Sequence, residues 1–257
     1  MIPKMLFLLN KSYLNVYSSW KLKQIGIRIS GHVPLAARKF LIDFSAAFRG
    51  NRLVFFDIGA SIGVISDCVA RLPNVAQIHS FEPLPEVYTQ LRKQMRFFSK
   101  AHCHQVALGD SNGVASMHIN KSSTSSSILP AGRLLQSEFP WTMEERKEEV
   151  AMARLDDFVR QFSLPGPDVI KVDVQGYELS VIKGGQDTIS QAKYCILEMN
   201  FQRLNQGGAI FDDVYQAMRQ LGFRLIGFGD AVRGVSHRQM FTDGLFAKDI
   251  AQDDKNA

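Results

Sequence analysis

The chain has 257 residues, of which 46% are hydrophobic and 21% are charged. This apolar content is too high for a disordered chain, and 19 glycines and 9 prolines are too few for a fibrous or low-complexity one. Three scattered cysteines without metal-ligand spacing argue against a disulfide framework and indicate a reducing compartment.

The net charge of +5 is concentrated at the start of the chain. Residues 1–50 contain eight Lys or Arg and one acid, Asp43, so they carry +7 and the remaining residues carry −2. Basic and apolar residues mix there without a single period, and we predict an N-terminal extension with short helices. We expect no secretory signal, and no apolar run reaches the roughly 18–20 residues of a membrane span.

From Arg52 onward, short apolar runs alternate with amphipathic stretches, which is typical of βα units around a mostly parallel sheet. We therefore predict one α/β domain over residues 51–250 and a polar tail at residues 251–257. The predicted strands are residues 53–58, 76–81, 104–108, 169–174, 194–199, 223–228 and 244–248. The predicted helices are residues 64–72, 86–98, 178–189 and 211–221.

Residues 111–150 depart from this alternation. The turn signal Asp110-Ser-Asn-Gly113 precedes an alternating stretch, Val114–Ile119, which predicts a strand at an exposed edge. Residues 122–127 that follow are all Ser or Thr. The segment is either a solvated insertion or a lid that helps to bind an acceptor, because long loops in compact domains are often functional.

The first predicted strand ends in an acid and a glycine-bearing turn with the pattern Asp57-x-Gly59-x-x-x-Gly63. Such a turn brings backbone close to a ligand, and the helix that opens at about Gly63 offers free N–H groups to a negative group. The pattern departs from the dinucleotide fingerprint, because Ser61 stands where that fingerprint requires glycine. The alternative is a tight turn with no ligand.

The second predicted strand also ends in an acid, Glu82, which lies 25 residues after Asp57. A carboxylate near this offset is placed to accept hydrogen bonds from both hydroxyl groups of a ribose. Because both elements occur in this order, the sequence favours a nucleoside site over an acid that merely ends a strand at the surface.

Six blocks of the chain resemble the FkbM-type S-adenosylmethionine-dependent methyltransferases, in the order typical of that family. They are Phe56–Gly63, Phe81–Pro83, Val106–Asp110, Arg154–Phe158, Ile170–Glu178 and Ile196–Glu198, within a resemblance that covers residues 51–248. The resemblance implies a Rossmann-like class I methyltransferase fold, an α/β fold with a mostly parallel seven-stranded sheet and helices on both faces. It also implies S-adenosyl-L-methionine as the cofactor.

The resemblance assigns cofactor contacts to the first three blocks. The turn that contains Gly59, Ala60 and Gly63 would lie against the methionine part of the cofactor, and Asp57 would support that turn. Glu82 would hold the ribose. The adenine would lie near Ala107 and Leu108.

The fourth strand of the parallel core ends in Asp173, which should face both the methyl donor and the acceptor because ligands of open α/β sheets bind at this edge. Asp173 is our candidate general base, and Glu198, at the end of the next strand, is a second catalytic candidate. Candidate acceptor contacts are Gln175, Glu178 and Asn200. For Glu178, stabilisation of a helix N-terminus is an equally good explanation.

Gln175 stands where the family usually has an acid, which argues against a two-carboxylate or metal-assisted mechanism. The six histidines have no ligand spacing, and we predict no metal site.

We predict an enzyme that transfers a methyl group to a hydroxyl of a sugar, glycolipid or secondary metabolite. The alternatives are N- or C-methylation of a small molecule, and a non-catalytic nucleoside-binding or assembly module. A nucleic-acid partner is not expected, because the basic extension lacks a recognisable binding motif. We expect a cytoplasmic protein whose basic, apolar-rich extension suits the inner membrane surface or a lipid-linked glycan.

Overall fold

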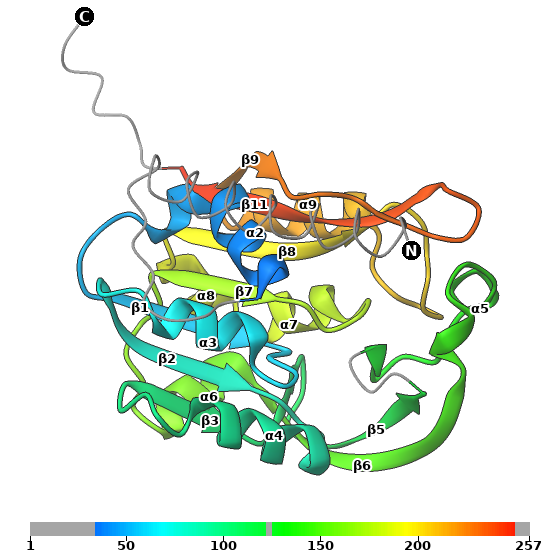
Figure 1. The fold of residues 1–257 in the computed structure, drawn as a ribbon, viewed down its shortest axis with the longest axis horizontal. Coiled ribbons are helices and arrows are strands. Elements are labelled where there is room, and N and C mark those ends of the chain that lie inside the picture. Colours follow the sequence, from blue (N-terminus) through cyan, green and yellow to red (C-terminus); the bar gives the residue numbers. More distant parts are fainter. Residues whose placement is uncertain (1–33, 122–124, 250–257) are drawn as a thin grey trace, which may run out of the picture.

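The computed structural model describes residues 34–121 and 125–249. Its main sheet has the order β10-β11-β8-β7-β1-β2-β3, and β9 pairs with β11 (Figure 1). The strands β1, β2, β3, β7 and β8 are parallel, whereas β11 is antiparallel to β8 and β9. Their bounds are β1 Leu53–Ile58, β2 Val75–Phe81, β3 Ala101–His104, β7 Val169–Val172, β8 Tyr194–Asn200, β9 Phe223–Phe228, β10 Val232–Arg233 and β11 Gln239–Lys248.

Helices cover both faces of this sheet. On one face lie α2 Leu35–Asp43, η1 Ser45–Phe48, α3 Val64–Ala70 and α4 Pro85–Met95. On the other face lie α6 Leu155–Gln161, α7 Glu178–Gly184, α8 Gln186–Gln191 and α9 Phe211–Gln220. The predicted fold class is confirmed, with one small difference: the two-residue β10 adds an eighth strand to the predicted seven.

The N-terminal helices are part of the core. Phe40 and Leu41 of α2 and Phe48 of η1 are buried with Phe55 of β1 in one cluster. The division into an extension of residues 1–50 and a domain of residues 51–250 stays a prediction, and most of the predicted extension lies outside the described residues.

The predicted strand at residues 104–108 is wrong. β3 ends at His104, which is paired with Phe81, the last residue of β2. The chain then crosses to a second sheet, where β4 Ala107–Gly109 pairs with β6. The apolar run continues through this crossing, so hydrophobicity alone did not reveal the break.

The predicted helix at residues 178–189 is two helices, α7 and α8. A side chain at Gly184 would place its Cβ 1.8 Å from the carbonyl oxygen of Gly109, and one at Gly185 would lie 2.7 Å from Leu155. Both glycines are therefore required by close packing where the chain changes direction.

The second sheet has the order β4-β6-β5, with β5 Gly113–Asn120 and β6 Glu144–Arg154 paired as an antiparallel ribbon. We call residues 113–154 the arm. Strand β5 lies at the edge of this sheet, as its alternating sequence predicted. The arm also carries α5 Arg133–Glu138 and η3 Pro140–Thr142, and it extends past the carboxyl ends of the main strands (Figure 1). Among the described residues, no helix has the length and apolar character needed to cross a membrane.

Candidate active site

A row of ionisable side chains crosses the main sheet on the face that α2 and α3 cover. Asp57 is paired with Lys171 in the strand register, and Glu198 is paired with Asp243. Asp173 follows two residues after Lys171, so its side chain lies on the same face of β7. We call Asp57, Lys171, Asp173, Glu198 and Asp243 the polar row. It lies at the carboxyl ends of the strands, where the sequence predicted the site.

The turn after β1 is shaped by positive backbone angles and close packing. Gly59 has φ +79°, and a Cβ there would lie 1.9 Å from the carbonyl oxygen of Asp173. Gly63 has φ +87° and begins α3. The N–H groups of Gly59 and Ala60 donate to the carbonyl of Phe81, which ties the turn to the end of β2.

Glu82 is held by this turn. The backbone N–H of Ser61 donates to Glu82 Oε2 at 3.1 Å, and the N–H of Leu84 donates to Oε1 at 3.0 Å. The side chain is buried, at 6% exposure. Burial raises the pKa of Glu82 to about 7, although both backbone hydrogen bonds act in the opposite direction.

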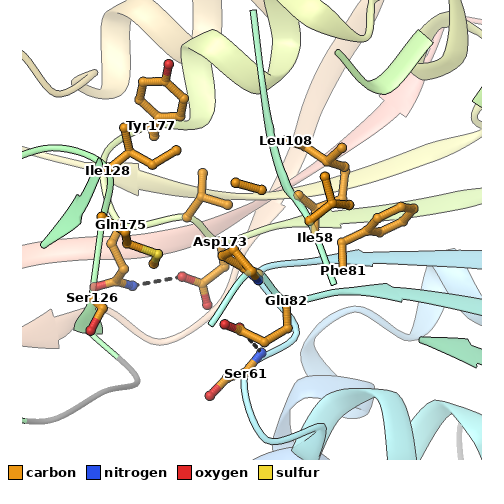
Figure 2. A pocket seen from close by; sticks show the side chains of 16 residues that line it. Ile58, Ser61, Phe81, Glu82, Leu108, Ser126, Ile128, Asp173, Gln175 and Tyr177 are labelled. Atoms are coloured by element: carbon orange, nitrogen blue, oxygen red, sulfur yellow. Dashed lines mark hydrogen bonds between the residues drawn. The ribbon is translucent and has the colours of Figure 1, made fainter. Parts of the chain in front are cut away.

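A cavity opens between the β1 turn, the ends of β2 and β7, and the arm. Glu82 and Asp173 both line it, and Figure 2 shows them in the centre of the view, with Ser61 beside Glu82. Ala107 and Leu108 are among the residues that line it; their contact with an adenine stays a prediction. The full lining is Ile58, Gly59, Ser61, Phe81, Glu82, Pro83, Val106, Ala107, Leu108, Met117, Ser126, Ile128, Asp173, Val174, Gln175 and Tyr177.

Asp173 is held from two sides at the edge of this cavity. Lys171 Nζ lies 3.1 Å from Asp173 Oδ2, and the Gln175 amide donates to Oδ1 at 2.8 Å. Burial opposes ionisation of Asp173, but the Lys171 ammonium and the hydrogen bonds outweigh it and hold the pKa of this carboxyl below its ordinary value. The group is therefore an ionised carboxylate at neutral pH.

Gln175 links two acids. Its Nε2 also donates to Glu198 Oε2 at 3.1 Å, so one amide bridges Asp173 and Glu198. Burial, together with the charges of Asp173 and Glu178, raises the pKa of Glu198 well above its ordinary value. Gln175 has φ +58°, a backbone conformation that costs a non-glycine residue energy and is typical of functional sites.

Several predicted site residues lie behind the cavity and not on its surface. The predicted site residues that do not line the cavity are Ala60 and Gly63 of the β1 turn, Glu178, and the three residues Asp57, Glu198 and Asn200. Asp57 Oδ2 accepts from the Ser66 hydroxyl at 2.6 Å, and Asn200 donates to Glu198 at 3.3 Å. These contacts place the three residues in the support of the site.

Glu178 is also a support residue. Its Oε1 accepts from the N–H groups of Val174 and Gly176, at 3.0 and 3.1 Å. The carboxyl is fully buried, which raises its pKa to about 7. These bonds hold the loop that carries Gln175, a structural role that differs from the helix N-terminus explanation considered from the sequence, because Val174 and Gly176 precede α7.

Sequence reasoning missed Lys171 and the particular arm residues at the cavity, although a lid that helps to bind an acceptor was one interpretation of residues 111–150. Lys171 lies inside an apolar strand. The signal that could have identified it is its position two residues before Asp173, which places both side chains on the same face of the strand. From the arm, Ser126 and Ile128 line the cavity, and the Ser127 hydroxyl donates to the Gln175 carbonyl at 2.9 Å. No local motif marked these residues, because the ribbon brings them to the site from a distance in sequence.

Comparison with known proteins agrees with the six sequence blocks. The model of a protein family described as "Methyltransferase FkbM domain" matches residues 57–225 of this chain. The chain belongs to the FkbM methyltransferase domain family. The resemblance stated from the sequence is thereby confirmed, and the polar row and the cavity belong to an FkbM domain.

Two curated relatives of this FkbM domain have specific names. The 2-O-methyltransferase NoeI of Sinorhizobium fredii is 30% identical over 160 residues, which are 60% of this chain and 66% of that protein. The hexuronic acid methyltransferase AglP of Haloferax volcanii is 26% identical over 147 residues, which are 57% of this chain and 56% of that protein. The chain thus spans less than two thirds of either relative.

A solved structure, the methyltransferase FkbM from Methylobacillus flagellatus KT, covers 77% of this chain and 44% of its own chain, with TM-score 0.45 and 17% identity. Among the described residues, no group of three or more His, Cys, Asp or Glu side chains could hold a metal ion.

Proposed function

We propose that this FkbM domain transfers a methyl group from S-adenosylmethionine to a hydroxyl group of a sugar, glycolipid or secondary metabolite. The observation that carries the proposal is the pair of carboxyl groups, Glu82 and Asp173, that line one cavity. Glu82 is buried without a cation, and Asp173 is ionised between Lys171 and Gln175. The first suits binding of neutral hydroxyl groups, and the second suits removal of a proton.

The residues present fit the cofactor. Gly59 leaves room that a Cβ would fill, and the buried Ser61 hydroxyl has no hydrogen-bond partner. Glu82 presents carboxylate oxygens that two ribose hydroxyls could share, and Ala107 and Leu108 form an apolar wall for a flat base. We therefore assign Gly59, Ala60 and Gly63 to the methionine end, with Asp57 supporting their turn.

When bound, S-adenosylmethionine supplies a methyl group that its sulfonium already activates. The protein must align the acceptor oxygen and accept its proton. Asp173 would take the proton from the acceptor hydroxyl as that oxygen bonds to the methyl carbon and the carbon–sulfur bond of the cofactor breaks to leave a neutral thioether. Such base assistance contributes about 10²–10⁴-fold to the rate. Gln175 and Glu198 keep that carboxylate in place, and Ile128 of the arm excludes water from the cavity.

The proposed acceptor follows from the relatives and from Asp173 together. One relative is named for methylation at a 2-O position and the other for a hexuronic acid. A carboxylate base suits an oxygen acceptor, since a hydroxyl must lose its proton during transfer. We propose a small-molecule or glycan acceptor, contacted by Gln175, with Asn200 supporting the site through its hydrogen bond to Glu198.

We propose further that the protein works in the cytoplasm, at the inner membrane surface. All three cysteines are free. Residues 1–33 carry five basic residues and no acid, which favours attraction to anionic lipid headgroups. A lipid-linked glycan would then be presented to the active site at that surface.

Calorimetry and turnover assays test the proposed function. Wild-type protein should bind S-adenosylmethionine, and Glu82→Ala should weaken binding about 10–100-fold, because charge-assisted hydrogen bonds contribute about 1.5–3 kcal/mol. Asp173→Asn should retain the cofactor but lose about 10²–10⁴-fold in turnover on a panel of sugars and hexuronic acids. Glu86→Ala, at an exposed position of α4, is the matched control.

A wild-type protein that fails to bind the cofactor, or a Glu82→Ala variant with unchanged affinity, contradicts the proposed function. Binding without turnover on any acceptor supports a non-catalytic binding module instead. Full turnover by Asp173→Asn shows that the base assignment is wrong.

A further inference from the structure

Lys171 is a buried cation in the middle of the polar row. Its side chain is about nine-tenths buried, with 7% of the side-chain surface exposed. Its Nζ lies 3.1 Å from Asp173 Oδ2 on the same strand and 3.8 Å from Asp57 Oδ1 on β1. Asp57 Oδ1 has no hydrogen-bond partner, so this ammonium is the nearest compensation for its charge.

Asp173 is surrounded by other acids from every neighbouring element. Asp57 lies on β1, Glu198 on β8 and Glu178 at the start of α7. Asp243 on β11 and Asp173 repel each other when both are ionised, and the charges of Asp173 and of Asp43 on α2 both raise the pKa of Asp243. Among the described residues, Lys171 is the cation that contacts Asp173. Without it, several carboxyl groups would share one desolvated face, and like charges in such a group favour protonation.

A lysine in this position is costly for the fold. Moving an ammonium out of water carries a large penalty unless close partners offset it, and an apolar side chain of similar length would fill the same strand position without that penalty. The neighbours of Lys171 in the strand are Ile170 and Val172, which are apolar and buried. The retention of a charge here therefore calls for a role beyond packing.

We propose that Lys171 is a positioning residue of the reaction: its ammonium keeps Asp173 ionised and fixes Oδ2, so that the carboxylate faces the acceptor hydroxyl as a base. The proposal rests on the proposed function. Gln175 completes the arrangement by holding Oδ1 and by separating Asp173 from Glu198. The acceptor proton moves to Asp173, and Lys171 gives up no proton in this step.

Two measurements on the full chain test this role. The first is a carbon-13 NMR titration of the Asp173 carboxyl in protein without cofactor, with the signal assigned by Asp173→Asn. In Lys171→Met, the midpoint should rise by at least one pH unit, whereas Lys171→Arg should stay near wild type. The second is the pH profile of kcat, whose acid limb should move to higher pH by the same amount while KM for the cofactor changes less than threefold.

Lys193→Met is the matched control, because Lys193 also pairs with a carboxylate, Asp168 at 2.8 Å, but at the surface. It should leave both the titration and the profile unchanged. A double variant separates the effect of charge from the effect of packing. Lys171→Met combined with Asp57→Asn removes one acid as well as the ammonium. The Asp173 titration midpoint should then move back toward that of the wild type.

An unchanged Asp173 midpoint in Lys171→Met overturns the proposal, as does a uniform loss of activity without a shifted acid limb. If Lys171→Met does not fold, Lys171→Gln decides. Loss of the ammonium should again raise the Asp173 midpoint, and no change would overturn the proposal. A shifted midpoint in a protein that never transfers methyl groups would instead overturn the proposed function and leave the electrostatic role standing.

Discussion

Glu82 serves two requirements that oppose each other. In the proposed function, Glu82 binds ribose hydroxyls as a carboxylate inside the cavity, but a buried carboxylate destabilises the empty protein. Two backbone N–H groups, from Ser61 and Leu84, reduce this cost without removing it, since the pKa of Glu82 is still raised to about 7. In the proposed function, Glu82 therefore lowers the stability of the empty protein and strengthens cofactor binding.

The raised pKa gives a prediction with a defined sign. The folded protein holds the Glu82 proton more tightly than the unfolded chain, so the associated stability is present below the ordinary pKa of 4.5 and is lost as the pH rises to about 7. Glu82→Gln should therefore stabilise the empty protein by about 1–2 kcal/mol at alkaline pH and by much less in acid. It should weaken cofactor binding at the same time.

Urea unfolding of both proteins on either side of this pH range measures the effect. Glu86→Gln on the exposed side of α4 provides the control. A gain in stability that is equal in acid and in alkali would contradict the titration of Glu82 as its cause.

At the residue level, the sequence predicted the acids that end strands and missed their partners. Asp57, Glu82 and Asp173 were found because each follows an apolar run at the carboxyl edge. Lys171 was missed because a lysine within a strand is usually a solvent-facing residue, and only the pairing of β7 with β1 shows that Asp57 lies beside it. Partners contributed by strand register are not visible in one strand's sequence.

At the level of elements, the parallel core was predicted well, and errors occurred where chain segments meet tertiary neighbours. Strands β1 and β9 have the predicted bounds. The break between β3 and β4, and the division of α7 from α8, depend on contacts with β2, Gly109 and Leu155. The arm was recognised as an insertion, but its ribbon geometry decides that Ser126 and Ile128 reach the cavity.

The helices α2 and η1 give a prediction about truncation. Phe40, Leu41, Phe44 and Phe48 are buried in the cluster that contains β1. Each such side chain contributes about 1.5–3 kcal/mol when buried, and a domain has about 5–15 kcal/mol in total. Deletion of residues 1–33 should preserve cooperative unfolding and cofactor binding, whereas deletion of residues 1–48 should abolish both.

Circular-dichroism melts and calorimetry of the two truncated proteins measure the difference. A cooperative melt of the shorter protein near the wild-type temperature would show that α2 and η1 are dispensable to the core. Loss of the melt in both proteins would show that residues 1–33 also contribute to folding.

At the scale of the whole molecule, the net positive charge and the candidate active site belong to different parts of the sequence. The five basic residues of the segment 1–33 equal the net charge of +5, so the remainder of the chain is neutral overall. A neutral catalytic domain has little general attraction to a polyanion, whereas each basic residue near an anionic membrane contributes about 1 kcal/mol of binding. We propose that the positive charge of residues 1–33 serves docking at a membrane surface.

Cosedimentation with vesicles tests whether the basic residues of segment 1–33 attach the protein to anionic membranes. The full chain should bind vesicles that contain phosphatidylserine and should not bind neutral phosphatidylcholine vesicles, and deletion of residues 1–33 should remove the difference while cofactor affinity stays the same. Binding should weaken steeply with salt, because the screening length shrinks from about 10 Å at 0.1 M to about 3 Å at 1 M. Replacement of the five basic residues by Gln in the full chain is the matched control for length and apolar content. If that variant still binds anionic vesicles as wild type does, the apolar residues of the segment, and not its charge, hold the protein at the membrane.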